Sequence, residues 1–493
     1  MLAWTVYLSF LGAFALMLVP RDDVRLARAI AFASSFAGLL LAFAAVLQAK
    51  TGDGIQTVAK MPWIPSLGIE YHLATDGISL TLLLLTGIAS VAGVLFSWNI
   101  EKRTKEYFAF YLALIGGVYG VFLSFDLFLL FVFYEIAIIP KYFLIAIWGS
   151  TNREYGAMKL ALYSFVGSGM VLIGLIAAFV VAGGKTASLL ELARFPFPWT
   201  FQYWAFPLVF VGFAILAGLW PFHTWAPTGH VAAPTAASML LAGVVMKLGA
   251  YGGLRVAMTL FPQGWVAWHY PIGLLATIGI VYGATVALVQ RDFKFVIGYS
   301  SVSHMGFVLL GLMTLNPTGL NGAVLQMFSH GIIAGLLFAV VGRMIYDRAH
   351  TRELTALEGM GLSRALPFAA VTFVIASAAS MGLPGFSGFV AELQVLIGAW
   401  HAFPAFAVFS GLGIVVGVAY TMRALQKAFF GESVASAHSG ELEPITVPER
   451  CGAAMLIGCT LLIGLFPRLL LELIGPSFAS PMFEGLRKGA GFP

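Results

Sequence analysis

DLFLLFVFYEIAIIPKYFLIAIWG, residues 126–149, is a nearly unbroken apolar run that carries a carboxylate, Glu135, close to its middle. A hydrocarbon core about 30 Å thick requires about 20 apolar residues in a helix, so the run predicts a transmembrane helix. An ionised side chain at the centre of such a helix costs at least about 3 kcal/mol unless it is partnered or hydrated. We therefore interpret Glu135 as a functional group. The alternative is a structural carboxylate held by a hydrogen bond within a tight bundle.

The composition of the whole chain is that of an integral membrane protein. Of the 493 residues, 60% are hydrophobic and 10% are charged, and the mean hydropathy is +0.92, whereas about 25% of the residues of soluble domains are charged. The net charge of +5 is a topology signal and gives no reason to expect nucleic-acid binding. Cys451 and Cys459 lack metal-ligand spacing, so we expect no disulfide, metal site or iron–sulfur cluster. The first apolar stretch lacks a basic leader and a cleavage site, so no removed signal peptide is expected.

Apolar runs of spanning length recur about fourteen times, which predicts an all-α polytopic membrane protein. They lie near 2–19, 27–48, 78–98, 107–124, 126–149, 156–183, 205–222, 232–257, 272–290, 294–314, 320–345, 365–402, 405–430 and 450–474. Lys and Arg concentrate in the connections that follow the odd-numbered runs. We therefore expect these loops in the cytoplasm and both termini on the opposite, periplasmic side.

Two of the runs contain helix breakers at comparable places. FAILAGLWPFHTWAPTGH includes Pro221, and ASMGLPGFSGFVAELQVL includes Pro384 beside three glycines, so each predicts a discontinuous helix. Broken helices five spans apart favour two inverted five-helix repeats, 106–257 and 272–431. N-terminal transmembrane helices (1–105) would precede them, and a C-terminal loop and last helix (432–493) would follow. The alternative is that Pro and Gly are simply common in membrane helices.

Ionisable side chains recur within these runs, and besides Glu135 they are Lys141, Lys159, Lys247, His304, His330 and Glu392. Lys247 lies deep within its run, so we expect a buried ammonium group that changes protonation state. Glu392 directly follows the second break, and we interpret it, like Glu135, as a functional group. For Lys159, a buried role and an interfacial position weigh equally. His304 and His330 have side chains that exchange protons near neutral pH, although a packing role is the usual fate of a lone histidine.

Four other polar residues are assigned to boundaries and breaks. Asp126 is predicted to cap the helix that carries Glu135, and Lys294 is predicted to anchor the entrance of its span. His223 and His230 flank the first break, where we expect them to cap freed carbonyl groups. The sequence has no nucleotide-binding loop, nucleophile triad or metal motif. The chain is thus predicted to carry charge without redox or hydrolytic chemistry of its own.

Five long stretches resemble the antiporter-like membrane subunits of respiratory complex I. They are FDLFLLFVFYEIAIIPKYFLIAIWG, WPFHTWAPTGHVAAPTAASMLLAGVVMKLGAYG, RDFKFVIGYSSVSHMGFVLLG, FSHGIIAGLLF and MGLPGFSGFVAEL. The subunit types of that family, L, M and N, differ at the second broken helix. Glu392 in FVAEL is similar to the glutamate of the M type, also called chain 4, where the other types carry lysine.

The resemblance implies a proton-translocating subunit of an NADH–quinone oxidoreductase, driven by quinone reduction elsewhere in the complex. Its relay would consist of Glu135, Lys247 and Glu392, with Lys159, His304 and His330 matching further family positions. No cofactor is implied in this chain, and NADH, FMN, iron–sulfur clusters and quinone would belong to other subunits. The implied partners are L-type and N-type antiporter-like chains and the lipid bilayer. The implied location is the bacterial inner membrane.

The chain departs from the family pattern in the first broken helix. Members usually carry a lysine just before the breaking proline, paired with the glutamate that Glu135 matches, but FVGFAILAGLWPFHTW has none. Our hypothesis is that Lys141 supplies the missing charge, although six residues rotate a helix by about 240° and place the two side chains on different faces. The alternative is that Lys141 extends to the cytoplasmic boundary. This half would then work with Glu135 and Lys247 alone.

Three other functions stay open from the residues. A subunit of a multisubunit cation/proton antiporter shares these motifs, but lysine is expected there in place of Glu392. A subunit of a membrane-bound hydrogenase is a second alternative. A spacer that has lost proton pumping is the third, because the expected lysine is missing.

Overall fold

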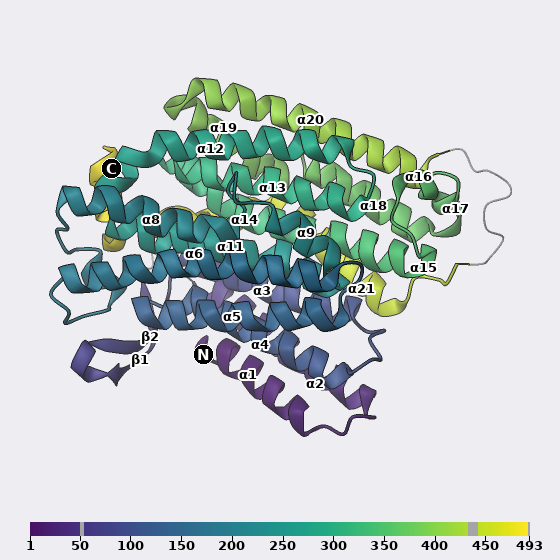
Figure 1. Cartoon of the computed structure of the whole chain (residues 1–493), viewed down its shortest axis with the longest axis horizontal. Coiled ribbons are helices and arrows are strands. Elements are labelled where there is room, and N and C mark those ends of the chain that lie inside the picture. Colours follow the sequence, from purple (N-terminus) through teal and green to yellow (C-terminus); the bar gives the residue numbers. More distant parts are fainter. Residues whose placement is uncertain (50–53, 432–441, 492–493) are drawn as a thin grey trace.

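Long helices packed side by side make up most of the computed structural model, which describes residues 1–49, 54–431 and 442–491. In Figure 1 the helices run roughly along the horizontal direction of the view. In the described residues, twelve helical segments are long and apolar enough to cross a membrane, and α1 (Ala3–Leu18) and α18 (Pro367–Ser380) are shorter apolar helices. The predicted all-α polytopic architecture is confirmed. Residues 432–441 of the predicted C-terminal segment lie outside the described residues.

The first half of the chain forms the lower part of the bundle in Figure 1. Its elements after α1 are α2 (Val24–Gln48), β1 (Gln56–Ile64), η1 (Pro65–Leu67), β2 (Ile69–Thr75), α3 (Gly77–Phe96), α4 (Thr104–Leu123), α5 (Leu127–Trp148), α6 (Arg153–Val181), α7 (Leu189–Leu192), α8 (Trp199–Ala217), α9 (Trp225–Ala232), α10 (Thr235–Leu240), η2 (Leu241–Val245), α11 (Met246–Gly252) and η3 (Gly253–Met258). The segments η2 and η3 are π-helical, so α10 to η3 form one continuous span.

The second half begins with α12 and ends with α23, which packs against α12. Its elements are α12 (Pro262–Val289), α13 (Phe293–Leu312), α14 (Pro317–Phe338), η4 (Ala339–Tyr346), α15 (Asp347–Ala349), α16 (Leu354–Leu357), α17 (Leu362–Ala365), α18, α19 (Ser387–Ala402), α20 (Pro404–Phe429), α21 (Val447–Leu465), α22 (Arg468–Ser477), η5 (Pro481–Phe483) and α23 (Glu484–Ala490). The π-helical η4 continues α14 into a long span.

Both predicted helix breaks are present. The helix α8 ends at Ala217 and α9 begins at Trp225, while α18 ends at Ser380 and α19 begins at Ser387. The indole of Trp225 donates a hydrogen bond to the Ile215 carbonyl at 2.8 Å, which satisfies one of the groups that the first break frees. The division into two repeats with the predicted boundaries stays a prediction.

The two most deeply buried spans of the bundle carry Lys247 and His330. The strongly apolar parts of Thr235–Met258 and Pro317–Ala349 are wholly buried by the rest of the chain, whereas those of α2, α20 and α21 are only about one third buried. The inner spans therefore contact protein on all sides, and the outer helices present apolar surface to whatever surrounds the chain.

Aspartate side chains cap the N-termini of several helices. The carboxylates of Asp76, Asp126 and Asp292 accept hydrogen bonds from backbone N–H groups in the first turns of α3, α5 and α13. This satisfies donors that have no partner within the helix. The predicted capping role of Asp126 is confirmed.

A β-hairpin is the element that the sequence did not reveal. The strands β1 and β2 pair antiparallel, with η1 and Gly68 between them, and the hairpin projects from the bundle at the left of Figure 1. Gly68 has a φ of 62°, in the left-handed region, and an added Cβ would lie 1.9 Å from the Lys185 carbonyl oxygen. The hairpin turn therefore requires glycine at this position.

Candidate functional site

Lys247 and His330 are in direct contact at the centre of the bundle. Lys247 on α11 is fully buried, and its Nζ lies 2.7 Å from Nδ1 of His330 on α14. The ammonium also donates to the carbonyl of Ala242 in the π-helical turn η2. Wider π-helical turns alter the backbone hydrogen-bond pattern and recur at functional sites. Lys247 is thus buried, as its position in the sequence predicts, and it has two polar partners.

His304 and Glu392 form the second close pair. Nδ1 of His304 on α13 lies 2.9 Å from Oε1 of Glu392 on α19. The side-chain amide of Gln326 donates to the same carboxylate oxygen at 3.3 Å, and Nε2 of His304 lies 3.3 Å from the Ser380 hydroxyl. Four helices therefore converge on this carboxylate and imidazole.

The two pairs are neighbours, because the rings of His304 and His330 stack. Their centroids are 5.5 Å apart, with 28° between the ring planes. Lys247, His330, His304 and Glu392 form one row of side chains across the middle of the bundle, which we call the central row.

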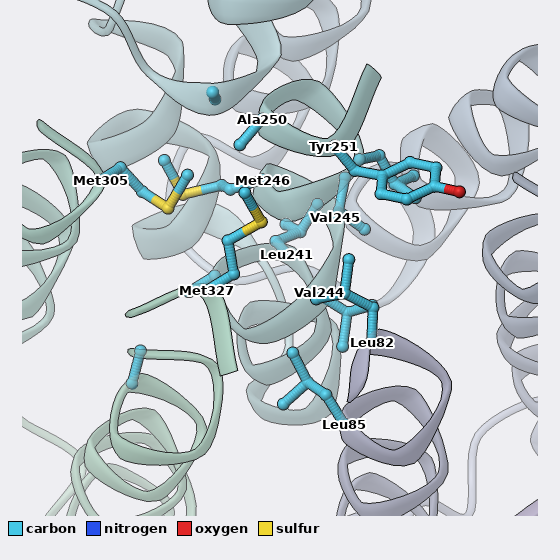
Figure 2. Close-up of a cluster of buried hydrophobic side chains, with 14 of the residues drawn as sticks. Leu82, Leu85, Leu241, Val244, Val245, Met246, Ala250, Tyr251, Met305 and Met327 are labelled. Carbon is cyan, nitrogen blue, oxygen red and sulfur yellow. The ribbon is translucent and has the colours of Figure 1, made fainter. Parts of the chain in front are cut away.

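A cluster of apolar side chains lies alongside the central row. Figure 2 shows the side chains of Met246, Met305 and Met327 pointing toward one another, close to Leu241 of η2. Each methionine is adjacent in sequence to a polar member of the site, namely Lys247, His304 or Gln326. An apolar neighbourhood lowers the local dielectric constant, so the charges of the central row interact more strongly than they would in water.

A glycine of the second helix break lies beside the Glu392 carboxylate. Gly382 has a φ of 71°, and a Cβ at this position would lie 3.1 Å from Oε2 of Glu392. The break thus brings backbone close to the carboxylate, and a larger residue there would be strained and crowded.

Glu135 lies outside the central row, on α5. Its side chain is half-buried, and Oε1 is buried without a hydrogen-bond partner. The Ser168 hydroxyl of α6 lies next to the carboxyl group but donates to the Phe165 carbonyl at 3.3 Å. Among the residues that the structure describes, no hydrogen bond or ion pair links Glu135 to Lys247.

Lys141 is buried on the same helix and does not extend to a boundary. Only 1% of the residue is exposed, and its Nζ donates to the Ser164 hydroxyl of α6 at 3.2 Å. Its charge acts on Glu135, but within the described ranges no carboxylate oxygen lies within 4.0 Å of the ammonium. The two groups are therefore near each other without forming a direct ion pair.

Lys159 is neither fully buried nor fully exposed at an interface, which are the two positions considered from the sequence. It is half-buried on α6, and its ammonium donates to the Thr228 hydroxyl of α9 at 3.4 Å and lies 5.7 Å from the centre of the Tyr155 ring. The side chain therefore contacts the second part of the first broken helix.

Three polar side chains differ from their predicted roles as a boundary anchor or as caps of the first break. Lys294 is 2% exposed and donates to the Ala233 carbonyl at 3.1 Å, at the edge of a cavity of about 510 Å³, because α13 packs against α9 and brings Lys294 to the end of that helix. His230 is fully buried, and neither of its ring nitrogens has a partner in the described chain, so it does not cap a carbonyl. The same holds for His223, whose ring lies edge-on to Tyr282.

Several polar residues of the site were missed from the sequence. Ser164 and Ser168 lie in an apolar run, where serine is unremarkable, although their spacing places them on one face of α6. Gln326 precedes His330 by four residues and lies on the same helix face. This spacing was the signal that could have found it.

Comparisons with known proteins identify the family of the chain. Residues 124–417 match the family described as "NADH:quinone oxidoreductase/Mrp antiporter, TM". The chain is 39% identical over 439 residues to NADH-quinone oxidoreductase subunit M of Rhodobacter capsulatus, covering 86% of this chain and 84% of the relative. It is 36% identical over 493 residues to the subunit M of Escherichia coli (strain K12), with 96% of each chain covered.

A solved structure shows the same architecture over nearly the whole chain. A chain of respiratory complex I from Thermus thermophilus with bound NADH superposes with a TM-score of 0.88 and 28% sequence identity, covering 98% of this chain and 100% of that chain. The fold, the family match and the identities agree with the resemblance of the motifs. This chain belongs to the NADH:quinone oxidoreductase/Mrp antiporter family of membrane subunits, and its relatives are M-type subunits of NADH-quinone oxidoreductase.

Proposed function

We propose that this chain moves protons across the membrane as the M-type subunit of an NADH–quinone oxidoreductase. The observation that carries the proposal is the central row, four proton-exchanging side chains held in contact within the most buried part of the bundle. Ionisable groups placed at such depth are costly and mark ion or proton pathways.

The contact between Lys247 and His330 has a defined direction for proton transfer. A lysine ammonium is purely a donor, so Nδ1 of His330 must carry no proton when it accepts from Nζ at 2.7 Å. Transfer of that proton leaves a neutral amine and an imidazolium. The imidazolium then donates from Nε2, which is buried and has no partner in the described residues.

His304 continues the row toward the second break. When Nδ1 of His304 carries a proton it donates to the Glu392 carboxylate at 2.9 Å, and Nε2 then accepts from the Ser380 hydroxyl. A proton delivered to Nε2 and released from Nδ1 to Glu392 crosses the ring without the imidazole moving. Reorientation of the rings resets the row.

Glu135, Lys141 and Lys159 form the other end of the proposed pathway. We assign Glu135 to exchange protons at the face of α5, and Lys159 to hold a positive charge beside α9. The repeats 106–257 and 272–431 would each supply one half of the pathway. Quinone reduction in other subunits, which would hold NADH, FMN, the iron–sulfur clusters and quinone, would drive it.

The surroundings follow from the same proposal. The neighbours would be L-type and N-type antiporter-like chains and the lipid bilayer, in the inner membrane of a bacterium, with both termini on the periplasmic side. A cation/proton antiporter subunit is the second candidate function, because the family description includes it. The glutamate at position 392, where lysine is expected in such antiporters, favours the oxidoreductase.

The test is redox-driven proton uptake in membranes that carry Glu392→Gln. The variant keeps the shape of the side chain and removes the negative charge that His304 contacts, so we expect pumping to fall by about tenfold or more while the complex stays assembled. Glu358→Gln is the matched control, since Glu358 forms a partly exposed ion pair with Lys427 outside the central row. Unchanged pumping in Glu392→Gln would refute the proposal, and failure to co-purify with iron–sulfur subunits would favour the antiporter.

A further inference from the structure

Two serines of α6 lie beside the two charged residues of α5. Lys141 is buried, and its one hydrogen bond to a side chain goes to Ser164. Four residues further along α6, Ser168 lies beside the Glu135 carboxyl group. Each charged residue of α5 therefore has one serine of α6 as its polar neighbour.

The helix geometry makes this arrangement regular. α5 and α6 are consecutive, packed helices joined by a short connection at 149–152, so they run antiparallel. Residues four apart lie on one face with a rise of about 6 Å, which places the two hydroxyls one above the other. The order along α6, Ser164 then Ser168, is the reverse of the order Glu135 then Lys141 along α5, as antiparallel packing requires.

The Lys141 side chain points the right way to use this arrangement. Side chains of a helix lean toward its N-terminus, which here is the direction of Glu135. Pro140 lies between the two charged residues and lacks a backbone N–H, so the Ile136 carbonyl loses its usual donor and the helix is locally loosened. The rotation of about 240° between Glu135 and Lys141 along α5 is therefore no obstacle, because both side chains contact α6 instead of each other.

We propose that Lys141 replaces the cation that the first broken helix lacks, and that Ser164 and Ser168 form the hydroxyl bridge through which it reaches Glu135. Lys141 is held by Ser164 when Glu135 is unpaired, and it moves along the serine face to pair with Glu135. A proton passed from the ammonium through a serine hydroxyl to the carboxylate leaves a neutral amine and a neutral acid. The hydroxyl accepts one proton and releases its own, so the net charge of the unit does not change.

Other nearby cations do not fit this role in the structure. Lys159 contacts Thr228 and Tyr155 at the α6–α9 contact. Lys247 contacts His330 and the Ala242 carbonyl. Both are thus engaged by other helices, whereas Lys141 lies on the helix of Glu135 itself.

A double-mutant cycle tests the pairing in assembled complex, and the inference rests on the proposed function. We expect Glu135→Gln and Lys141→Met each to lower the rate of redox-driven proton uptake through this chain by about tenfold, as for loss of a hydrogen bond to a charged group. The double variant should be no worse than either single variant, because one unit has been removed twice. Lys141→Arg keeps the charge and should retain more uptake than Lys141→Met.

The outcomes separate the two proposals. If Glu135→Gln has no effect, the role of this half in pumping is wrong. If Glu135→Gln lowers uptake but Lys141→Met does not, or if the two losses multiply, the pairing with Lys141 is wrong while the proposed function stands. Assembly is checked by co-purification, so a variant that fails to assemble is replaced by Lys141→Gln.

The serine bridge has its own test. Ser164→Ala and Ser168→Ala should each lower uptake by several-fold, the effect of one hydrogen bond of about 1 kcal/mol. In the Lys141→Met background, neither alanine should add a further loss. Ser410→Ala is the matched control, because Ser410 is buried on α20 without a partner in the described residues. Equal effects of the serine variants with and without Lys141 would overturn the bridge.

Discussion

The buried ion pair between Asp76 and Arg255 gives a prediction whose size follows from the structure. Two oxygens of Asp76 accept from two nitrogens of Arg255 at 2.7 Å each, and both side chains are at most 1% exposed. The guanidinium also contacts the Tyr251 hydroxyl at 3.1 Å. The pair joins the start of α3 to η3, the end of the span that carries Lys247.

We expect Asp76→Asn to destabilise the chain by about 3–5 kcal/mol, because a guanidinium is left buried without its counter-charge. Asparagine caps a helix as well as aspartate does, so the cap of α3 is kept and the effect of the charge is isolated. For a chain of 493 residues, an unfolding entropy of about 2 cal/mol/K per residue converts this loss into a fall of about 3–5 °C in the melting temperature.

Asp292→Asn is the matched control. Asp292 also caps a helix and pairs with an arginine, Arg352, but its side chain is 23% exposed. A partly solvated pair is worth about 1 kcal/mol or less, so the expected fall is about 1 °C. The assay is gel filtration of detergent-solubilised complex after heating, with the chain detected by a fluorescent tag.

The reasoning is refuted if both asparagine variants lower the melting temperature equally, or if Asp76→Asn is neutral. Asp76→Asn combined with Arg255→Met should recover most of the loss, since no unpaired charge is left in the interior. A double variant that is less stable than Asp76→Asn would show that Arg255 acts through its contacts with Tyr251 instead.

Two further predictions concern the start of α5 and the second break. Burial raises the pKa of Asp126 from 3.8 to about 6, so its contribution to stability is present below about pH 4 and is lost as the pH rises through about 6. Asp126→Asn should remove this dependence, measured by heating at pH 5 and pH 8. Because the amide cannot accept the hydrogen bond that the Glu70 N–H donates to Oδ2, the test is the stability difference between the two pH values, and a variant that keeps the wild-type difference would contradict it. Gly382→Ala places a Cβ 3.1 Å from the Glu392 carboxylate at a φ of 71°, which costs about 1 kcal/mol or more. Pumping should fall by several-fold, and unchanged pumping would show that the break tolerates a side chain.

The proposal accounts for the lysine that the first broken helix lacks. A buried cation, Lys141, lies on α5 and donates to Ser164. This arrangement argues against a spacer that has lost its function, because a buried lysine without a task is costly.

Much of the architecture could be predicted because each membrane span is specified by residues that are consecutive in the sequence. About 20 consecutive apolar residues are needed for a span, whatever the rest of the chain does. The fourteen runs, both breaks and the capping role of Asp126 could thus be found from nearest neighbours in sequence. The hairpin β1–β2 was missed because its strands form a polar surface element without a spanning pattern.

Side-chain partners were settled by tertiary structure alone. Lys247 meets a residue 83 positions away, and Asp76 meets one 179 positions away; nothing local in sequence specifies such contacts. The same limit explains Lys294 and Lys141, which were given boundary positions or left open because burial depends on which helix packs over a side chain. The sequence by itself determined that charges lie within the membrane, since each must sit in its apolar run. Which of these charged groups come into hydrogen-bonding contact was decided by the packing of the helices, because a hydrogen bond requires atoms within about 3 Å.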